Sequence, residues 1–161
     1  MSVRAVLYAA LAALAACSPM SADAGQRTAA SAPARHPLSG LAVVPLTIAS
    51  ANGRHAFRVE VARAEPEQAK GLMFRTAMGP DEGMIFPMEP ARQASFWMKN
   101  TVISLDLVFI GPDRRIESVA ANAVPYSLSP INSRGSVSAV LELNGGRAAQ
   151  LGLAVGDVVS W

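Results

Sequence analysis

The residues of this chain that could do chemistry lie inside apolar runs. They comprise two cations, two carboxylates, an amide and an indole ring: Arg75, Trp97, Lys99, Asn100, Asp106 and Glu142. We call these six residues the polar set. If their side chains converge, they would line a pocket that binds a polar ligand or supports acid–base chemistry. The alternative is structural, with the same groups forming ion pairs and hydrogen bonds that hold loops in place.

Two members of the polar set, Asp106 and Glu142, are carboxylates on separate predicted strands. A carboxylate pair can flank a bond and hydrolyse it, here with Lys99 assisting and Trp97 as a wall on which a sugar ring stacks. Asp106 shares one face of its predicted strand with the large aliphatic residues Val108 and Ile110, so its carboxylate needs a partner or a wet pocket. A hydrolase that uses a carboxylate pair is therefore one alternative for this chain.

Metal, cofactor and covalent chemistry have little support in the sequence. Cys17 is the only cysteine, so alone it can form neither an internal disulfide nor a thiolate metal site. The methionines near the polar set lie in core-like runs, where methionine usually fills gaps. No Gly-x-Ser-x-Gly motif is present, and a catalytic triad would have to depend on His55. We expect no metal and no cofactor, and the sequence identifies no catalytic residue.

The polar set would be positioned by a domain built mainly of strands. Alternating apolar residues and closely spaced turn signals predict strands over residues 41–48, 54–62, 83–88, 94–100, 105–110, 115–121, 137–143 and 154–161. Two short helices are predicted over residues 65–70 and 147–151. No regular strand–helix–strand alternation appears. We predict an all-β fold, a compact antiparallel sandwich or barrel of jelly-roll type.

The N-terminal residues resemble a bacterial lipoprotein signal. An apolar run too short to span a bilayer leads into Leu14-Ala15-Ala16-Cys17, which matches the pattern that ends in a lipidated cysteine. We predict a signal peptide over residues 1–16, a lipidated Cys17 with a flexible tether over residues 17–40, and one domain over residues 41–161. The tether is assigned from its content of Ala, Ser, Pro and Gly.

The predicted partners follow from this signal and from the charge. A lipid on Cys17 would anchor the protein to a membrane without a spanning helix. Ser18 follows the cysteine, and in this the signal resembles those that send lipoproteins to the outer membrane, with the domain facing the periplasm. The formal net charge is +2 and the basic residues form no run, so no nucleic-acid partner is expected.

Six short motifs occur in an order that resembles a known family. They are Gly71-Leu72-Met73-Phe74-Arg75, Gly83-Met84-Ile85-Phe86, Phe96-Trp97-Met98-Lys99-Asn100-Thr101, Leu105-Asp106, Val140-Leu141-Glu142-Leu143 and Gly156-Asp157. Together they resemble domain-of-unknown-function family 192, from about Val59 to Trp161. The resemblance implies a compact all-β domain, often behind a signal peptide, and no activity. Ser104 departs from the family pattern, which usually has proline there.

The sequence as a whole favours a cell-envelope lipoprotein that binds a small molecule or a protein partner. The candidate ligand-binding residues are the polar set, with Trp97 as a wall. Two alternatives are the carboxylate-pair hydrolase and a structural envelope protein without a ligand. These hypotheses differ at Asp106, because a buried structural carboxylate stabilises the fold whereas a site carboxylate contributes little to it.

Overall fold

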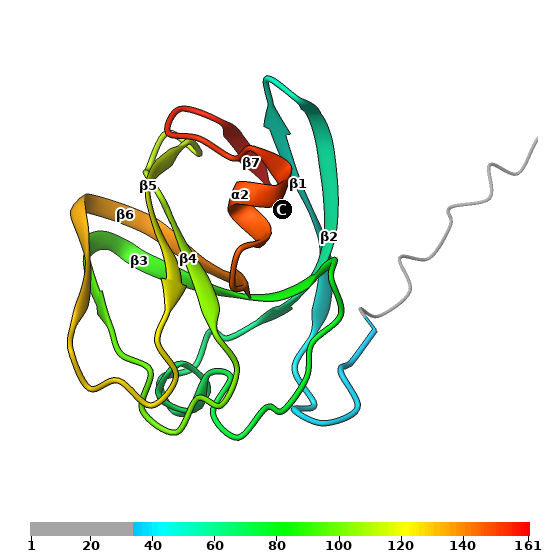
Figure 1. Cartoon of the computed structure of the whole chain (residues 1–161), viewed down its shortest axis with the longest axis vertical. Helices are drawn as coiled ribbons and strands as arrows, with labels where there is room; N and C mark the ends of the chain where they lie inside the picture. Colours follow the sequence, from blue (N-terminus) through cyan, green and yellow to red (C-terminus); the bar gives the residue numbers. More distant parts are fainter. Residues whose placement is uncertain (1–33) are drawn as a thin grey trace, which may run out of the picture. The chain divides into compact units, whose positions relative to one another are not determined.

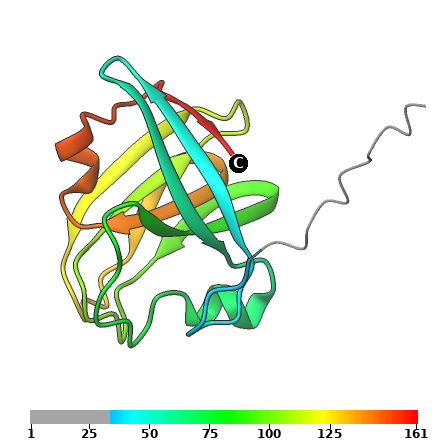
Figure 2. The same cartoon turned by 90° about the vertical axis from the view of Figure 1, so that its right-hand side faces the viewer.

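The computed structural model describes residues 34–161 of the chain (Figures 1 and 2). The predicted signal peptide, Cys17 and most of the predicted tether lie outside the described residues. Residues 34–40, which the sequence analysis assigned to the tether, form a turn whose Ser39 hydroxyl donates to Glu60 of the domain. The folded part therefore begins no later than residue 34. Within the described part of the chain, no helix is long and apolar enough to cross a membrane.

The described part of the chain folds into seven strands and two short helices. In chain order they are β1 (Val43–Ser50), β2 (Gly53–Val61), α1 (Glu65–Lys70), β3 (Glu82–Phe96), β4 (Leu105–Ile110), β5 (Ile116–Ala123), β6 (Ile131–Asn144), α2 (Arg147–Leu151) and β7 (Val158–Ser160). Both helices occupy the residues predicted for them. Helix α1 starts where proline and two glutamates, at the positive end of the helix dipole, favour a first turn.

The strands form one sheet in the order β5-β4-β6-β3-β2-β1-β7, which curls into a half-barrel (Figure 1). A bridge between Arg115 and Val158 joins its two edges. Neighbouring strands are antiparallel except β2 and β3, which are parallel and connected through α1. The prediction of an all-β fold is confirmed. The sheet is mostly antiparallel, and β2 and β3 form its one parallel pair among the described strands because the crossover through α1 lets β3 run in the same direction as β2.

Strand alternation divides the apolar residues between two hydrophobic clusters. The first cluster takes side chains from all seven strands and fills the inside of the curl; its members include Leu46, Phe57, Ile85, Val108, Ile116, Leu141 and Val159. The second cluster lies on the opposite face of β3, β4 and β6 and includes Met84, Phe86, Leu105, Leu107, Phe109 and Val140. Parts of β3 and β6 are therefore covered on both faces, and β4 is buried at every position.

One predicted strand is wrong in its second half. The sequence predicts a strand over residues 94–100, but β3 ends at Phe96 and residues 97–101 lie outside any strand. Asn100 takes the left-handed conformation, with a φ of 56°, and its carbonyl accepts a 2.8 Å hydrogen bond from the Phe74 backbone N–H. This hydrogen bond ties the loop to the segment that follows α1, so the chain turns here and does not continue as a strand.

Candidate functional site

Glu142 is a buried carboxyl group that the fold leaves without a full set of partners. It lies on β6, opposite Met84 of β3 and Leu107 of β4, on the face of the sheet that carries the second cluster. The residue is 5% exposed, and within residues 34–161 its Oε2 atom has no hydrogen-bond partner. Burial raises the pKa of this carboxyl group to about 8, so it is mainly protonated at neutral pH.

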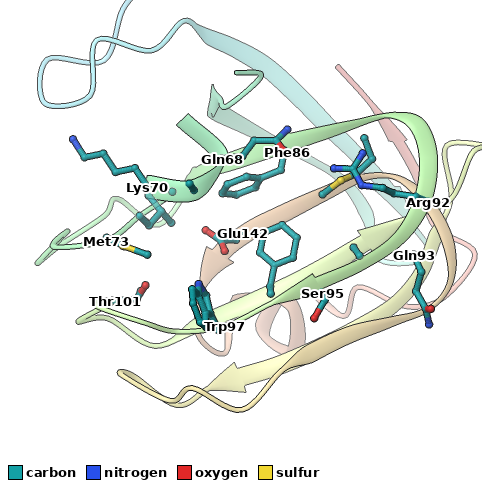
Figure 3. Close-up of a pocket in the computed structure, with 16 residues that line it drawn as sticks. Gln68, Lys70, Met73, Phe86, Arg92, Gln93, Ser95, Trp97, Thr101 and Glu142 are labelled. Atoms are coloured by element: carbon teal, nitrogen blue, oxygen red, sulfur yellow. The ribbon is translucent and has the colours of Figure 1, made fainter. Parts of the chain in front are cut away.

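Glu142 lines a cavity of about 300 Å³ (Figure 3). The larger apolar lining residues are Leu72, Met73, Phe86, Met88, Phe96 and Trp97, and the polar ones are Gln68, Lys70, Arg92, Gln93, Ser95 and Thr101. Figure 3 shows the Glu142 carboxyl group between Phe86, Trp97 and Met73, whereas the Lys70 ammonium group points away from it. Among the described lining residues, Glu142 alone has a carboxyl group. The cavity thus combines aromatic and thioether walls with one neutral acid.

Two glycines allow the walls to close around Glu142. At Gly83, an added Cβ atom would lie 2.5 Å from the carbonyl oxygen of Glu142, so glycine lets β3 run this close to β6. At Gly71, φ is +48° and an added Cβ atom would lie 3.4 Å from the Phe86 ring. Glycine therefore brings both β3 and the end of α1 against the site.

Side-chain contacts then fix the walls relative to one another. The rings of Phe86 and Phe96 meet edge to face, with centroids 5.1 Å apart and an interplanar angle of 84°. The Gln68 amide donates to the carbonyl oxygens of Pro87 at 2.9 Å and Ala62 at 3.2 Å. These bonds hold α1 against β3, so the cavity is preformed by packed elements and does not depend on mobile loops alone.

Asp106, the other predicted carboxylate of the site, does not share this cavity. In the pairing of β4 with β6, Asp106 lies opposite Leu143, whereas Glu142 lies opposite Leu107. Successive residues of a strand point to opposite faces, so the two carboxyl groups lie on opposite faces of the sheet. The register therefore contradicts the hydrolase that would use these two residues as a carboxylate pair.

Asp106 is held by backbone amides. The N–H groups of Asn122 and Gly146 donate to its Oδ1 atom at 2.8 and 2.9 Å, and the N–H group of Ala148 donates to its Oδ2 atom at 2.8 Å. The residue is 0% exposed, so these three bonds replace its contacts with water. Asp106 thereby ties β4 to β5 and to the start of α2, which is a structural role.

Arg75 is engaged in a separate cluster. Its guanidinium group lies 2.9 Å from Oε1 of Glu60 on β2. The Ser39 hydroxyl and the His36 ring face the same carboxylate. Strand alternation predicts Glu60 on the solvent-facing side of β2, but the residue is only 3% exposed. Its burial is possible because Arg75 and Ser39, both distant in sequence, supply the partners that water would otherwise provide.

Trp97, Lys99 and Asn100 lie in the loop that follows β3. Trp97 lines the cavity and is 50% exposed, and the Lys99 ammonium group is 5.1 Å from the centre of its ring. The side-chain nitrogen of Asn100 contacts the sulfur of Met73 at 3.8 Å. The structure thus brings Trp97 and Glu142 to one cavity, with Lys99 and Asn100 beside it.

The aromatic walls are the part of the site that the sequence analysis missed. Phe86, Met88 and Phe96 lie in apolar runs, which the sequence analysis assigns to the core. The available signal was the alternation within β3, which puts Met84, Phe86 and Met88 on one face. That signal becomes informative only when the pairing of β3 with β6 sets Met84 opposite Glu142.

One protein family matches most of the chain. Domain-of-unknown-function family 192, described as "Uncharacterized ACR", matches residues 47–161. The chain belongs to this family. A crystal structure of a protein of unknown function from Novosphingobium aromaticivorans DSM 12444 has a TM-score of 0.79 and 57% identity, covering 82% of this chain and 94% of that one. A Sinorhizobium meliloti 1021 structure, described as a "putative transcription regulator", has a TM-score of 0.72 and 40% identity, covering 74% and 94%.

No curated protein matches the chain. In both solved structures, the region matched by this chain makes up 94% of the chain. The same family motifs also gather at the cavity: four of them contribute lining residues, including Met73, Phe86, Trp97 and Glu142. A fifth family 192 motif, Leu105-Asp106, forms the backbone anchor described above.

Proposed function

We propose that this protein is a lipid-anchored protein of the cell envelope whose domain binds a small molecule in the Glu142 cavity. The observation that carries the proposal is the buried Oε2 atom of Glu142, which has no hydrogen-bond partner among the described residues and belongs to a cavity-lining side chain. Nearly all buried polar groups of native proteins are hydrogen-bonded, so an exception beside a cavity calls for a partner. A ligand atom that reaches the Glu142 carboxyl group would supply it.

The chemistry of the cavity defines the class of ligand. A carboxyl group with a pKa of about 8 is protonated at neutral pH and donates a hydrogen bond to a carbonyl, hydroxyl or ether oxygen. Phe86, Phe96 and Trp97 offer apolar and aromatic contact to the rest of the ligand. The volume of about 300 Å³ is at the small end of ligand pockets. The proposed ligand is therefore compact, with an apolar body and one oxygen acceptor.

Binding fits this cavity better than hydrolysis does. Acid–base hydrolysis needs a second group that exchanges a proton or attacks the substrate. Among the described lining residues, the other charged groups are Lys70 and Arg92, and both residues are exposed. Asp106 lies on the other face of the sheet. A single neutral acid orients a ligand, but it completes no catalytic pair.

The location within the envelope rests on the N-terminal sequence. Residues 14–17 follow the lipoprotein pattern, and Ser18 favours the outer membrane. The domain would face the periplasm on a tether that spans at most about 60 Å between Cys17 and residue 34 when fully extended. A fatty-acid label incorporated by the wild type and lost in Cys17→Ala supports the anchor, and a label retained in the variant refutes it.

The ligand proposal is tested by a thermal-shift screen of the chain from Ser18, produced without lipid. The compounds are small ketones, phenols, alcohols, sugars, organic acids and amines. Wild type is compared with Glu142→Leu and with the exposed-acid control Glu65→Gln. A compound that raises the melting temperature of wild type and control, but not of Glu142→Leu, supports the site. Equal shifts in all three proteins place binding elsewhere, and no shift in any of them refutes small-molecule binding.

The pH dependence of binding identifies the chemistry of the ligand. An oxygen acceptor loses affinity above about pH 8, because the ionised Glu142 carboxylate no longer donates a hydrogen bond. An amine shows the opposite trend, because its ammonium group pairs with the ionised carboxylate. Lys70 and Arg92 also line the cavity, and the variants Lys70→Met and Arg92→Gln control for their charges.

A further inference from the structure

Exposed apolar side chains are concentrated at one end of the domain. Within residues 34–161, nine large hydrophobic residues are exposed, and seven of them lie on four loop segments. These seven are Leu38, Phe74, Trp97, Val102, Val124, Tyr126 and Leu128, with exposed fractions from 36% to 75%. We call the four segments, residues 35–41, 72–77, 97–102 and 124–128, the loop end. The other two exposed residues, Val155 and Val158, lie near the C-terminus.

Backbone hydrogen bonds fix the segments of the loop end side by side. The Phe74 N–H donates to the Asn100 carbonyl at 2.8 Å, and the Tyr126 N–H donates to the Thr101 carbonyl at 3.1 Å. Leu38 and Phe74 line one shared groove, and Trp97 and Leu128 line another. Figures 1 and 2 show these loops together at the lower end of the domain, away from α2 and the β1–β2 hairpin. The exposed side chains therefore form one surface.

The backbone at this surface is strained in a way that presents aromatic rings. Phe74 and Tyr126 have φ angles of 63° and 61°, in the left-handed region that bulky residues rarely adopt. Their side chains are 68% and 60% exposed, so packing against the domain does not account for the strain. Strain of this kind tends to gather at functional surfaces.

The charge of the loop end has one sign. None of its four segments contains Asp or Glu, whereas Arg35 and Lys99 are exposed on it. Arg75 also belongs to it but is paired with Glu60 beneath the surface. At the border, Glu67 of α1 lines the same groove as Leu38. The surface therefore combines aromatic, aliphatic and cationic groups without a carboxylate of its own.

We propose that the loop end docks on the surface of a bilayer that contains anionic phospholipids, with Phe74, Trp97, Tyr126 and Leu128 entering the headgroup region. Aromatic rings and cations without acids are the composition of membrane-interface surfaces. A second copy of the chain fits less well, because a two-fold contact would bring like charges together with no carboxylate to pair them. Residue 34, the first described residue, directly precedes the segment 35–41, so the preceding chain leads into the loop end.

Tryptophan fluorescence provides the direct test. The chain has two tryptophans, Trp97 on the loop end and Trp161, whose ring lies 3.8 Å from the Arg114 guanidinium group. Trp161→Phe leaves Trp97 as the reporter, and Trp97→Phe leaves Trp161. The chain from Ser18 without lipid is mixed with phosphatidylethanolamine–phosphatidylglycerol vesicles whose acyl chains carry bromine. Because the chain from Ser18 lacks Cys17 and carries no lipid, any vesicle binding that it shows comes from the domain itself.

The expected result is quenching and a blue shift of Trp97, no change at Trp161, and weaker binding at high salt. Absence of quenching, or equal quenching of both tryptophans, would overturn the proposal. Phe74→Asn and Tyr126→Asn suit the left-handed backbone and should each reduce vesicle partitioning by about tenfold. Val155→Ser, at the opposite end, is the matched control and should leave partitioning unchanged.

Two further measurements distinguish membrane docking from loss of folding and from self-association. The melting temperatures of the Phe74 and Tyr126 variants should stay close to that of the wild type, because both side chains are exposed. Sedimentation should show a monomer whose state does not depend on these residues. A concentration-dependent dimer that the same variants disrupt, together with no vesicle binding, would assign the loop end to self-association and refute the membrane proposal.

Discussion

Two of the buried carboxyl groups of this domain, those of Asp106 and Glu142, lie on adjacent strands and have opposite surroundings. Asp106 is completely buried and accepts three backbone hydrogen bonds. Glu142 is 5% exposed and lines a cavity, and its Oε2 atom has no partner within the described residues. In the pairing of β4 with β6, the two residues are offset by one position. This offset puts Asp106 where backbone N–H groups can donate to it, and Glu142 where its Oε2 atom lacks a hydrogen-bond partner among the described residues.

The different surroundings of the two carboxyl groups suggest different roles, a structural one for Asp106 and a binding one for Glu142. Three backbone N–H groups donate hydrogen bonds to Asp106 and thereby connect three elements of the fold. Nothing comparable offsets the desolvation of Glu142, so its ionised form is disfavoured and its pKa is raised. A buried carboxyl group with a raised pKa and an oxygen atom that lacks a partner is better explained by a binding role than by a structural one. We therefore assign a structural role to Asp106, and the proposed ligand contact is Glu142.

The largest expected effect is the loss of the Asp106 anchor. Asp106→Ala leaves the N–H groups of Asn122, Gly146 and Ala148 without their acceptor and should lower the free energy of unfolding by about 4 kcal/mol. Urea unfolding at neutral pH measures the loss. The control is Asp113→Ala, because Asp113 accepts one hydrogen bond in an exposed turn. If both variants lose the same small amount, Asp106 is not the structural anchor.

The next effect concerns the buried ion pair between Arg75 and Glu60. Arg75→Met leaves the Glu60 carboxylate buried with too few partners and should lower the free energy of unfolding by about 3 kcal/mol. Replacing both charges, in Arg75→Met with Glu60→Leu, should recover most of this loss. Denaturant curves of the single and double variants decide the matter. If the double variant is as unstable as Arg75→Met alone, the loss of stability comes from losing the ion pair and not from leaving the Glu60 carboxylate buried without its partner.

The sequence predicts the local elements of this fold well and its long-range contacts poorly. Helix α1 and the alternation of β4 follow from capping, the helix dipole and period-two patterning, which act over a few residues. The parallel pairing of β2 with β3 and the burial of Glu60 depend on partners far along the chain. Alternation places Glu60 on the correct face of β2, but no local pattern shows that Arg75 and Ser39 cover this face and bury the carboxylate.

The candidate site shows the same division. Trp97 and Glu142 were predicted from their polar groups in apolar motifs, and both line the cavity. Phe86 was missed, because an aromatic residue in an apolar run is equally typical of a core. Asp106 and Glu142 could not be told apart from the sequence, since their faces depend on the register between β4 and β6. That register is fixed by tertiary packing, which the sequence pattern does not reveal.

The raised pKa of Glu142 predicts that the free energy of unfolding depends on pH. The pKa is raised from the usual 4.5 to about 8, so the unfolded chain ionises first. The stability is therefore complete below about pH 4 and falls as the pH rises towards 8. Between pH 5 and pH 7, wild type should lose about 2 to 3 kcal/mol relative to Glu142→Gln, which cannot ionise. Urea unfolding of both proteins over this range measures the difference.

The comparison with Glu142→Gln removes the contributions of other groups. The Glu67 carboxylate, for example, has a pKa lowered by hydrogen bonds from the backbone N–H groups of Ala64 and Arg63, and it is present in both proteins. Its contribution cancels in the difference, as do those of the remaining acids. Parallel pH profiles for wild type and variant would mean that Glu142 is ionised and satisfied in the folded state, and the contrast with Asp106 would disappear.

The smallest expected effect is that of Lys99, which belongs to the polar set but lies outside both carboxyl environments. Its ammonium group is 5.1 Å from the centre of the half-exposed Trp97 ring, whereas the Arg114 guanidinium lies 3.8 Å from that of Trp161. Lys99→Met should change the free energy of unfolding by less than about 0.5 kcal/mol, and Arg114→Met by about 1 kcal/mol. Thermal unfolding of both variants measures this order. A Lys99 variant as unstable as Asp106→Ala would make the loop after β3 part of the structural network, because only a residue that supports buried contacts can affect stability so strongly.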